Sequence, residues 1–285
     1  MKNNETSENL EKISKELELV NKKLKESEAF KTNFISNITN EIVNPFSSIL
    51  GLSKNIMSVK EKDYCKIKTM AELIYSEAFD LDFQLKNIFA AAKIEAGEIE
   101  PEIMNVDINK LILSVLDIYK FKSDKKLLSI NFNYDNSLEL KNKFFFKTDS
   151  EKLKLILSNL LSNSIKYSNA ADRIEIKLWI ENDNLEIKVK DNGIGIDKKD
   201  LKIIFDRFRR IDTSINSVNK GHGLGLSVTK ALVNILDGNI KVTSKINSGS
   251  IFTISIPEAK TTNIEGFAVD DNEFFFDNDN DNEIF

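Results

Sequence analysis

The spacing of the apolar residues changes once along the chain, near Pro101, and this change constrains the fold more than any other feature. Before Pro101 the apolar residues recur every three or four positions, as they do on one face of a helix. After it, segments of helical spacing alternate with short segments in which apolar and polar residues alternate, as in strands. A chain of 285 residues holds about two domains. We therefore expect a multi-domain protein with an α-helical part followed by an α+β part.

The first thirty residues carry a heptad-like apolar seam. Its members are Leu10, Ile13, Leu17, Val20 and Leu24. Alternating gaps of three and four are typical of a coiled coil, although a lone amphipathic helix fits so short a run as well. We expect a coiled-coil signalling helix over residues 1–29.

Two longer helices are expected between the seam and Pro101. Apolar residues keep helical spacing over 34–50, where Pro45 should kink the helix, and again over 67–89, with an end near Gly97. A polar stretch near residues 61–63 separates the two segments. The resulting helical hairpin, residues 30–100, has too little core to be stable alone. We therefore predict a homodimer in which two hairpins form a four-helix bundle.

The part after Pro101 is expected to form an α+β sandwich with its helices on one face of a sheet, over residues 101–258. A polar turn at 182–184 joins two of the strands, and no packed element is expected past Pro257. The expected helices cover 106–122, 150–166 and 223–236, and the expected strands cover 129–133, 143–147, 174–181, 185–190, 240–244 and 251–256.

Charge and composition exclude several classes of protein. The net charge of −5 comes largely from seven acids in the last sixteen residues, so the rest of the chain is close to neutral and does not indicate a nucleic-acid surface. No apolar run approaches the ~20 residues that a membrane span requires. Cys65 is the one cysteine, which excludes a disulfide framework and a cysteine-clustered metal site. These features indicate a soluble, cytoplasmic protein.

The acidic segment 259–285 is expected to be a disordered tail. Its Asp277-x-Asp279-x-Asp281 pattern is similar to the start of a calcium-binding loop. Asn282, however, stands where such a loop has its turn glycine, and the chain ends before the last ligand. We therefore do not predict a calcium site there.

Two glycine-bearing loops in the second part are typical of phosphate binding. Glycine lets the backbone approach a ligand closely, and a helix N-terminus presents free N–H groups and about +0.5 charge to an anion. Either loop alone is a weak signal, because glycine turns are common. The loops are Asp191-Asn192-Gly193-Ile194-Gly195, which follows an expected strand, and Gly221-His222-Gly223-Leu224-Gly225, which opens an expected helix.

A third element strengthens the prediction of a nucleotide site. Asn159 and Asn163 lie four residues apart and share a face of the helix expected over 150–166. An amide oxygen is a suitable ligand for magnesium, and the nearby Lys166 can meet phosphate charge. A solvated polar helix face is the plainer interpretation of these residues alone, but the glycine loops that follow disfavour it.

Together these segments resemble the ATP-binding catalytic domain of sensor histidine kinases, a family whose nucleotide fold is shared with chaperone ATPases. Five motifs appear in the family's order, and they are LKLILSNLLSNSIKYS, VKDNGIGID, IFDRFRRID, GHGLGLSVTKALV and GSIFTISIP. The resemblance covers about residues 104–257. Upstream, FISNITNEIVNPF over 34–46 is similar to the family's phosphoacceptor helix. One departure is mild, since Asn247 stands where relatives often have the first of two glycines.

The resemblance implies a site for ATP and Mg²⁺. Asn163 matches the magnesium-coordinating asparagine and Asn159 supports it, Lys166 would contact phosphate, and Tyr167 would lie against the nucleotide. Asp191 matches the aspartate that accepts a hydrogen bond from the adenine amino group. The remaining implied residues are Gly193 and Gly195 near the base, Phe205 and Phe208 as anchors of a lid over about 209–220, Arg207 as a phosphate contact, and Gly221, Gly223, Leu224 and Gly225 over the phosphates.

The decisive departure is Asn40, which stands where the family has its phosphoacceptor histidine. A carboxamide nitrogen shares its lone pair with the carbonyl, whereas a neutral imidazole has a free lone pair at pH 7. The only histidine of the chain, His222, falls in the lid motif and cannot substitute. We therefore expect no autophosphorylation. Three interpretations remain: a natural loss, an engineered substitution, or an alignment shifted by a few residues, against which Glu41 and Pro45 fall in the family's places.

The residues beside Asn40 keep a second activity open. Glu41 matches the family's general base, and Asn44 matches the polar residue that orients water when the phosphoaspartate of a partner is hydrolysed. We expect a homodimer that works on a response-regulator receiver domain or on another histidine kinase. The alternatives are a non-catalytic, ATP-sensing dimeric partner, and a serine-directed protein kinase, anti-sigma kinase or chaperone ATPase of the same nucleotide fold.

Overall fold

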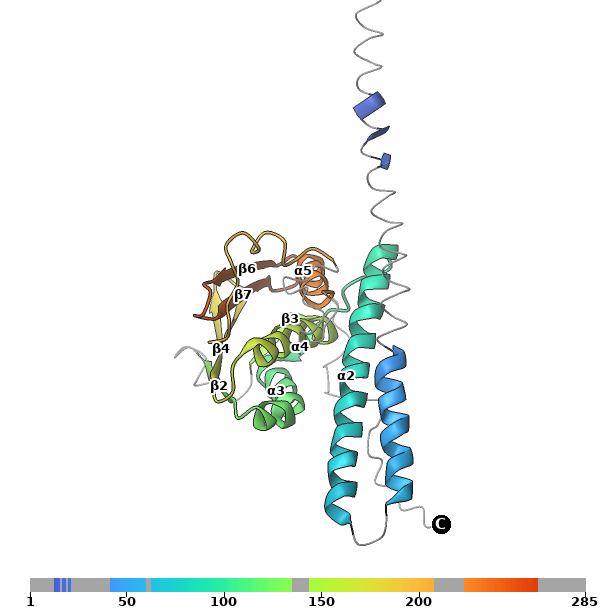
Figure 1. Ribbon diagram of the computed structural model, residues 1–285. Coiled ribbons are helices and arrows are strands. Elements are labelled where there is room, and N and C mark those ends of the chain that lie inside the picture. The colour runs from blue at the N-terminus through green and yellow to red at the C-terminus, as the bar shows by residue number, and fades with distance from the viewer. Residues whose placement is uncertain are drawn as a thin grey trace, which may run out of the picture. The chain divides into compact units, whose positions relative to one another are not determined.

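The computed structural model describes residues 13–15, 17, 18, 20, 21, 42–59, 63–134, 144–207 and 223–260. It divides into two compact units, Met1–Phe89 and Ala90–Phe285, and each is considered by itself (Figure 1). Most of the expected coiled coil, the acidic tail and several expected site residues lie outside the described residues. The site residues concerned are Asn40, Glu41, Phe208, Gly221 and His222.

Both expected helices of the first part are present where the structure describes them, while residues 34–41 of the first lie outside the described residues. Residues 42–58, Pro45 among them, are helical, and helix α2 covers Tyr64–Ala96 and continues into the second unit. The end of α2 falls where the sequence predicts it. Gly97, at φ +67°, donates from its N–H to Ile94 O (3.2 Å), and the N–H of Glu98 donates to Lys93 O (3.0 Å). This pair of bonds is a Schellman C-cap, which requires a positive φ and therefore favours glycine.

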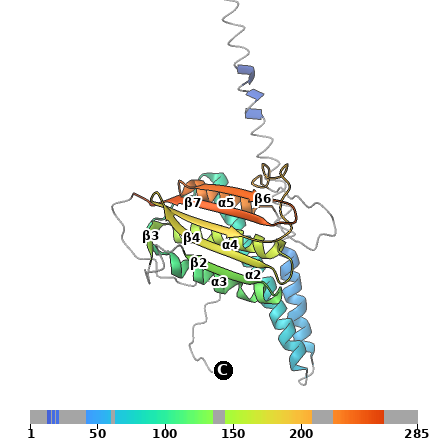
Figure 2. The ribbon, with the colours of Figure 1, turned by 90° about the vertical axis from the view of Figure 1, so that its left-hand side faces the viewer.

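The second unit is built on a five-stranded sheet in the order β2-β4-β5-β7-β6. Strands β2 and β4 pair in parallel, and all other neighbours are antiparallel. Helices α3, α4 and α5 lie together on one face of the sheet, and none of the described helices covers the other face, which is turned to the viewer in Figure 2. The strands are β2 (Ser129–Tyr134), β4 (Arg173–Glu181), β5 (Asn184–Lys190), β6 (Asn239–Ser244) and β7 (Ser250–Pro257), and the helices are α3 (Ile108–Lys125), α4 (Ser150–Tyr167) and α5 (Gly225–Ile235).

Alternation along the strands places every second side chain in the core between sheet and helices. β5 alternates strictly between half-buried and buried residues, and its Leu185 and Ile187 are fully buried. They face the apolar side of α4, where Leu160 and Leu161 are also fully buried. The turn between β4 and β5 contains Asn182 and Asp183, both at positive φ, which is typical of a two-residue hairpin turn. These findings confirm the expected sandwich with its helices on one face.

The sequence prediction was wrong at the start of this unit. Residues 104–107 form strand β1 (Met104–Asp107), which pairs antiparallel with β3 (Phe145–Thr148), and α3 begins only after Asp107. A strand of four residues is too short to show a period of two, and the sequence prediction includes Val106 and Asp107 in the helix that follows. The chain also stays attached past Pro257, since the N–H of Ala259 donates to Lys147 O (3.0 Å).

Within the described residues, no helix is long and apolar enough to cross a membrane.

Candidate functional site

Asp191 follows β5 and lies at the centre of the predicted site, with 5% of its surface exposed. Its Oδ1 accepts hydrogen bonds from the N–H of Gly193 (2.9 Å) and the N–H of Ser250 (3.1 Å). Burial raises the pKa of the Asp191 carboxyl, and the two backbone N–H groups offset this only in part. Its Oδ2 takes no hydrogen bond from the described part of the chain, so a rigidly held acceptor is left for a ligand.

Three glycines around Asp191 stand where the backbone of another segment leaves no room for a side chain. A Cβ at Gly193 would lie 2.2 Å from Tyr167 O, and one at Gly195, which has φ +69°, would lie 2.0 Å from Lys245 O. A Cβ at Gly249 would lie 1.9 Å from Asp191 O. From the sequence we expect Gly193 and Gly195 to let a ligand approach the backbone. In the structure, backbone segments approach one another at these two glycines and at Gly249, and they hold Asp191 in place.

Helix α4 supplies the two asparagines. Asn159 is 2% exposed, and its Nδ2 has no hydrogen-bond partner in the residues that the structure describes. Its Oδ1 lies against the first residue of α5, because a Cβ at Gly225 would be 3.1 Å from it. Asn163, one turn further on, is half-buried. The unpartnered amide of Asn159 is the kind of buried polar group that a bound ligand or water satisfies.

The C-terminal end of α4 joins the loop that follows β5. The N–H of Ile194 donates to Tyr167 O (3.1 Å), so the α4 terminus and the loop of Asp191 are in direct contact. Lys166 and Tyr167 are half-buried, and Lys166 Nζ lies 4.8 Å from the centroid of the Tyr167 ring. This cation–π contact places a positive charge at the end of the helix that carries both asparagines.

The N-terminus of α5 is left without a side-chain cap. Leu224 occupies the N-cap position and provides no side-chain acceptor, and Gly223 before it has φ +70°. The first N–H groups of an α-helix have no partner inside the helix, and they favour an anion. Asn159 adjoins this terminus through Gly225. The predicted asparagine, aspartate and second glycine motifs thus come together from α4, β5 and α5.

The same region matches known proteins. Residues 148–260 match the family described as Histidine kinase-, DNA gyrase B-, and HSP90-like ATPase. The chain is 29% identical over 238 residues to the circadian input-output histidine kinase CikA of Synechococcus elongatus, covering 81% of this chain and 30% of CikA. It is 27% identical over 231 residues to the sensor-like histidine kinase SenX3 of Mycolicibacterium smegmatis, covering 81% of this chain and 58% of SenX3.

These relatives are sensor histidine kinases, and the matches support the same family for this chain. Its second unit holds a histidine-kinase-type ATP-binding α/β domain. The fold is also similar to that of the histidine kinase ThkA, solved in complex with the response regulator protein TrrA, with a TM-score of 0.53 and 20% identity over 82% of this chain and 64% of that one. The chain spans less than two thirds of the curated relatives it matches.

The predicted lid region is described only at its borders. Phe205 is half-buried, with Lys230 Nζ 5.3 Å from the centroid of its ring. Arg207, a predicted phosphate contact, forms an ion pair with Glu95 of α2. The structure therefore gives Arg207 a protein partner that the sequence did not indicate.

Two residues of the site were missed. Ser250 supplies a backbone N–H to Asp191, and its Oγ lies 3.0 Å from Ser244 Oγ. Lys126 donates from Nζ to Ile165 O (2.8 Å) and Lys166 O (2.9 Å), the last carbonyls of α4. Burial lowers the pKa of Lys126, and nearby Asp172 opposes this shift more weakly. The sequence carries no signal for either role, because one uses a backbone group and the other an ordinary lysine after a helix.

The predicted acceptor end is described only at Asn44, which is exposed on the helical segment 42–58. Asn40 and Glu41 lie outside the described residues, so the roles assigned to them stay predictions.

Proposed function

We propose that the ATP-binding domain of this chain binds ATP with Mg²⁺ and is a competent phosphoryl donor. The observation that carries the proposal is Asp191, a buried carboxylate with Oδ1 anchored by two backbone N–H groups and Oδ2 left as an acceptor. An acceptor fixed in this way suits the amino group of adenine and rejects the carbonyl that guanine has in its place.

The triphosphate and its metal would lie between α4 and α5. Asn163 would ligate Mg²⁺ through its amide oxygen, with Asn159 beside it and Lys166 near the phosphates. The uncapped N-terminus of α5 at Gly225, preceded by Gly223 and Leu224, would cover the phosphates. Gly221 and Arg207 would complete the contacts once nucleotide is bound. Catalysis by such a donor is mainly positioning and charge stabilisation.

The acceptor half would lack its nucleophile, because Asn40 cannot take a phosphoryl group. Glu41 and Asn44 remain at positions suited to hydrolysis of an aspartyl phosphate, and Asn44 is exposed to solvent. We therefore infer two possible activities for the chain: phosphatase action on a response-regulator receiver domain, or phosphorylation of another histidine kinase. ThkA, a relative in fold, has been solved with a response regulator, which supports the first class of partner. Both activities would use ATP or a phosphorylated regulator, so the proposal includes a cytoplasmic location.

A homodimer through the helical hairpin is part of the proposal. Val43, Phe46 and Leu50 share one face of the segment 42–58 and are each more than half exposed. A surface helix of a monomer rarely exposes such an apolar stripe, whereas a second hairpin packed on it would bury the stripe.

Radiolabelled ATP tests donor and acceptor separately. We expect no label on the chain with Asn40, label on the Asn40→His variant, and label on an acceptor-only histidine kinase domain mixed with the Asn40 chain. Magnesium-dependent ATP binding by calorimetry should be the same for the Asn40 chain and the variant. Binding without label on either acceptor would favour the non-catalytic, ATP-sensing partner. Absence of binding would remove the proposal altogether.

A further inference from the structure

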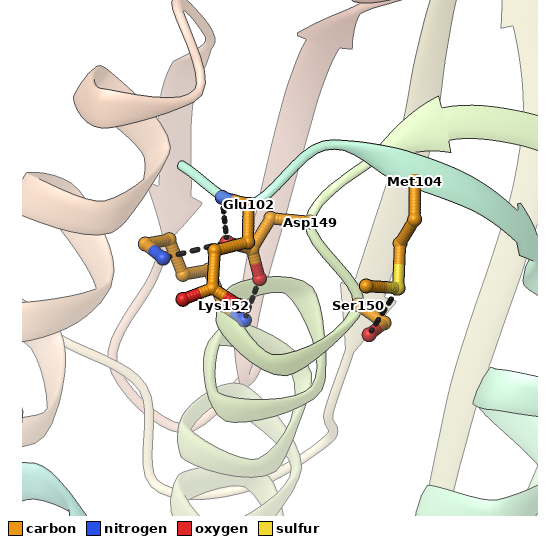
Figure 3. A network of polar contacts seen from close by, with 5 residues as sticks. All are labelled: Glu102, Met104, Asp149, Ser150 and Lys152. Carbon is orange, nitrogen blue, oxygen red and sulfur yellow. Dashed lines mark hydrogen bonds and ion pairs between the residues drawn. The ribbon is translucent and has the colours of Figure 1, made fainter. Parts of the chain in front are cut away.

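A buried carboxylate, Asp149, joins the linker after α2 to the start of α4 (Figure 3). Asp149 is 2% exposed, and both of its oxygens are used. Oδ1 accepts from the N–H of Lys152 (2.9 Å), which is an ordinary N-cap bond. Oδ2 accepts from the N–H of Glu102 (2.8 Å), 47 residues upstream, and from Lys152 Nζ (2.5 Å).

The bond from the N–H of Glu102 to Asp149 Oδ2 is not needed for capping α4, because Oδ1 already makes the cap bond. Asp107 caps α3 in the same way, with Oδ1 accepting from the N–H of Lys110 (3.2 Å), yet Asp107 is only half-buried and has no linker bond. Burying a carboxylate is costly unless it is paired and hydrogen-bonded. At Asp149 this cost is offset partly by Lys152 and partly by the linker amide, so the linker is a component of the buried site.

The bond to Glu102 shortens the free part of the linker. The C-cap of α2 ends with the N–H of Glu98, and Glu102 is the next residue whose backbone is held. Only residues 99–101 lie between these points, and Pro101 restricts them further. Without the Asp149 bond the next fixed residue is Met104, which pairs with Thr148 in the β1–β3 sheet. Ser150 Oγ also lies 3.6 Å from Met104 Sδ.

Asp149 precedes the first residue of α4, and the same helix carries the asparagines of the proposed nucleotide site. Helix α4 runs without interruption from Ser150 to Tyr167, so it moves as a rigid element. Asn159 contacts the first residue of α5, Gly225, and Asn163 lies one turn further along the helix. A linker fastened at Asp149 is therefore fastened to the helix that would hold the metal and phosphates.

We propose that Asp149 is a positioning residue for phosphoryl transfer: through Oδ2 it fixes the linker that follows α2 to the N-terminus of the helix that carries the magnesium asparagine. The inference rests on the proposed function. A fixed linker raises the share of encounters in which donor and acceptor are correctly oriented, and a small misplacement of reacting groups costs a large factor in rate. Nucleotide affinity does not depend on that orientation, so the two properties should separate.

The test uses the full chain carrying Asn40→His as parent, with phosphorylation at position 40 and MgATP affinity measured on each variant. Asp149→Asn keeps an oxygen for the cap but replaces the Oδ2 acceptor by an amino group. Glu102→Pro removes the donor N–H and leaves Asp149 untouched. Each should lower the phosphorylation rate roughly tenfold or more, the effect of losing about one hydrogen bond to a charged group, with the MgATP dissociation constant within about twofold. The double variant should be no slower than either single variant.

Two matched controls fix the interpretation. Asp107→Asn alters the equivalent cap of α3, and Glu102→Gln removes the side-chain charge but keeps the N–H. Both should stay within about twofold of the parent rate. A parental rate in Asp149→Asn and Glu102→Pro overturns the inference, and so does a parallel loss of rate, affinity and melting temperature, which indicates a cap alone. If the parent itself binds no MgATP, the proposed function fails first, and the inference fails with it.

Discussion

Asp191 and Ser250 bond to each other in both directions across 59 residues of chain. The N–H of Asp191 donates to Ser250 O (2.9 Å), and the N–H of Ser250 donates to Asp191 Oδ1 (3.1 Å). The first bond fixes the backbone of the β5 terminus against β7, and the second fixes the carboxylate. A side chain held by backbone groups has few ways to reorient, so its free oxygen is preorganised for a ligand.

Asp191→Asn should lower MgATP affinity by roughly tenfold or more while the fold is kept. The amide oxygen can still accept from Gly193 and Ser250, but the amide nitrogen then meets the amino group of adenine donor to donor, which costs about 1–3 kcal/mol. Calorimetric titration measures the affinity, and the melting temperature checks the fold. Asp197→Asn, in the same loop, serves as the control and should bind MgATP like the native chain. Equal affinities in the two variants would exclude Asp191 from the nucleotide site.

MgATP binding should weaken with falling pH earlier than an ordinary aspartate predicts. Burial raises the pKa of Asp191, and only the charged form leaves both oxygens as acceptors. For stability the sign is the reverse: a carboxyl whose folded pKa is raised favours the folded state at low pH, and that contribution is lost as pH rises through the folded pKa. Titration of affinity over about pH 4 to 7 tests this. In the Asp191→Asn variant this fall of MgATP affinity at low pH should be absent. If the fall persists in that variant, another group causes it.

Parts of the fold that depend on local chemistry could be predicted from the sequence. Gly97 ends α2 because its C-cap needs a positive φ, and Asn182 and Asp183 form the turn between β4 and β5 because both tolerate one. Asn247 adopts φ +59° where relatives often have glycine, which explains why that departure is mild. In each case the residue type alone restricts the backbone.

Features that depend on contacts distant in sequence could not be predicted. Strand β1 exists because β3 pairs with it, and its four residues carry no period of their own. The second oxygen of Asp149 accepts from the N–H of Glu102, 47 residues upstream, so no local pattern indicates that bond. The motifs predicted which segments of α4, β5 and α5 would come together, but the groups that hold these elements in position belong to Lys126 and to the Ser250 backbone.

Gly249→Ala should be strongly destabilising, in contrast to the same change at Gly51. Gly249 has φ +82°, and a Cβ there would lie 1.9 Å from Asp191 O, so the loop or the aspartate must move. We expect a loss of about 3 kcal/mol or more in the free energy of unfolding, and weaker MgATP binding. Gly51 lies in the helical segment 42–58 with nothing within 4 Å of such a Cβ, so Gly51→Ala should stabilise by up to about 1 kcal/mol. Urea unfolding measures the free energy of unfolding of both variants. A loss well below about 3 kcal/mol in Gly249→Ala would contradict the described loop packing.

Lys126→Met should destabilise the ATP-binding domain more than a surface lysine can, because the Lys126 ammonium holds two carbonyls at the end of α4. Removing it leaves Ile165 O and Lys166 O without their donor, beside the bond from Ile194 to Tyr167 O that joins α4 to the Asp191 loop. Hydrogen bonds to a charged group contribute about 1.5–3 kcal/mol each, so a loss of about 2 kcal/mol is expected even if water replaces one of them. Lys125→Met, at the exposed neighbouring position, should change the free energy of unfolding by less than about 0.5 kcal/mol. Methionine preserves most of the side-chain volume in both variants, so the difference between their urea midpoints reports the lost ammonium. Equal midpoints would mean that the C-terminal end of α4, and with it Lys166 and Tyr167, is held in place without Lys126.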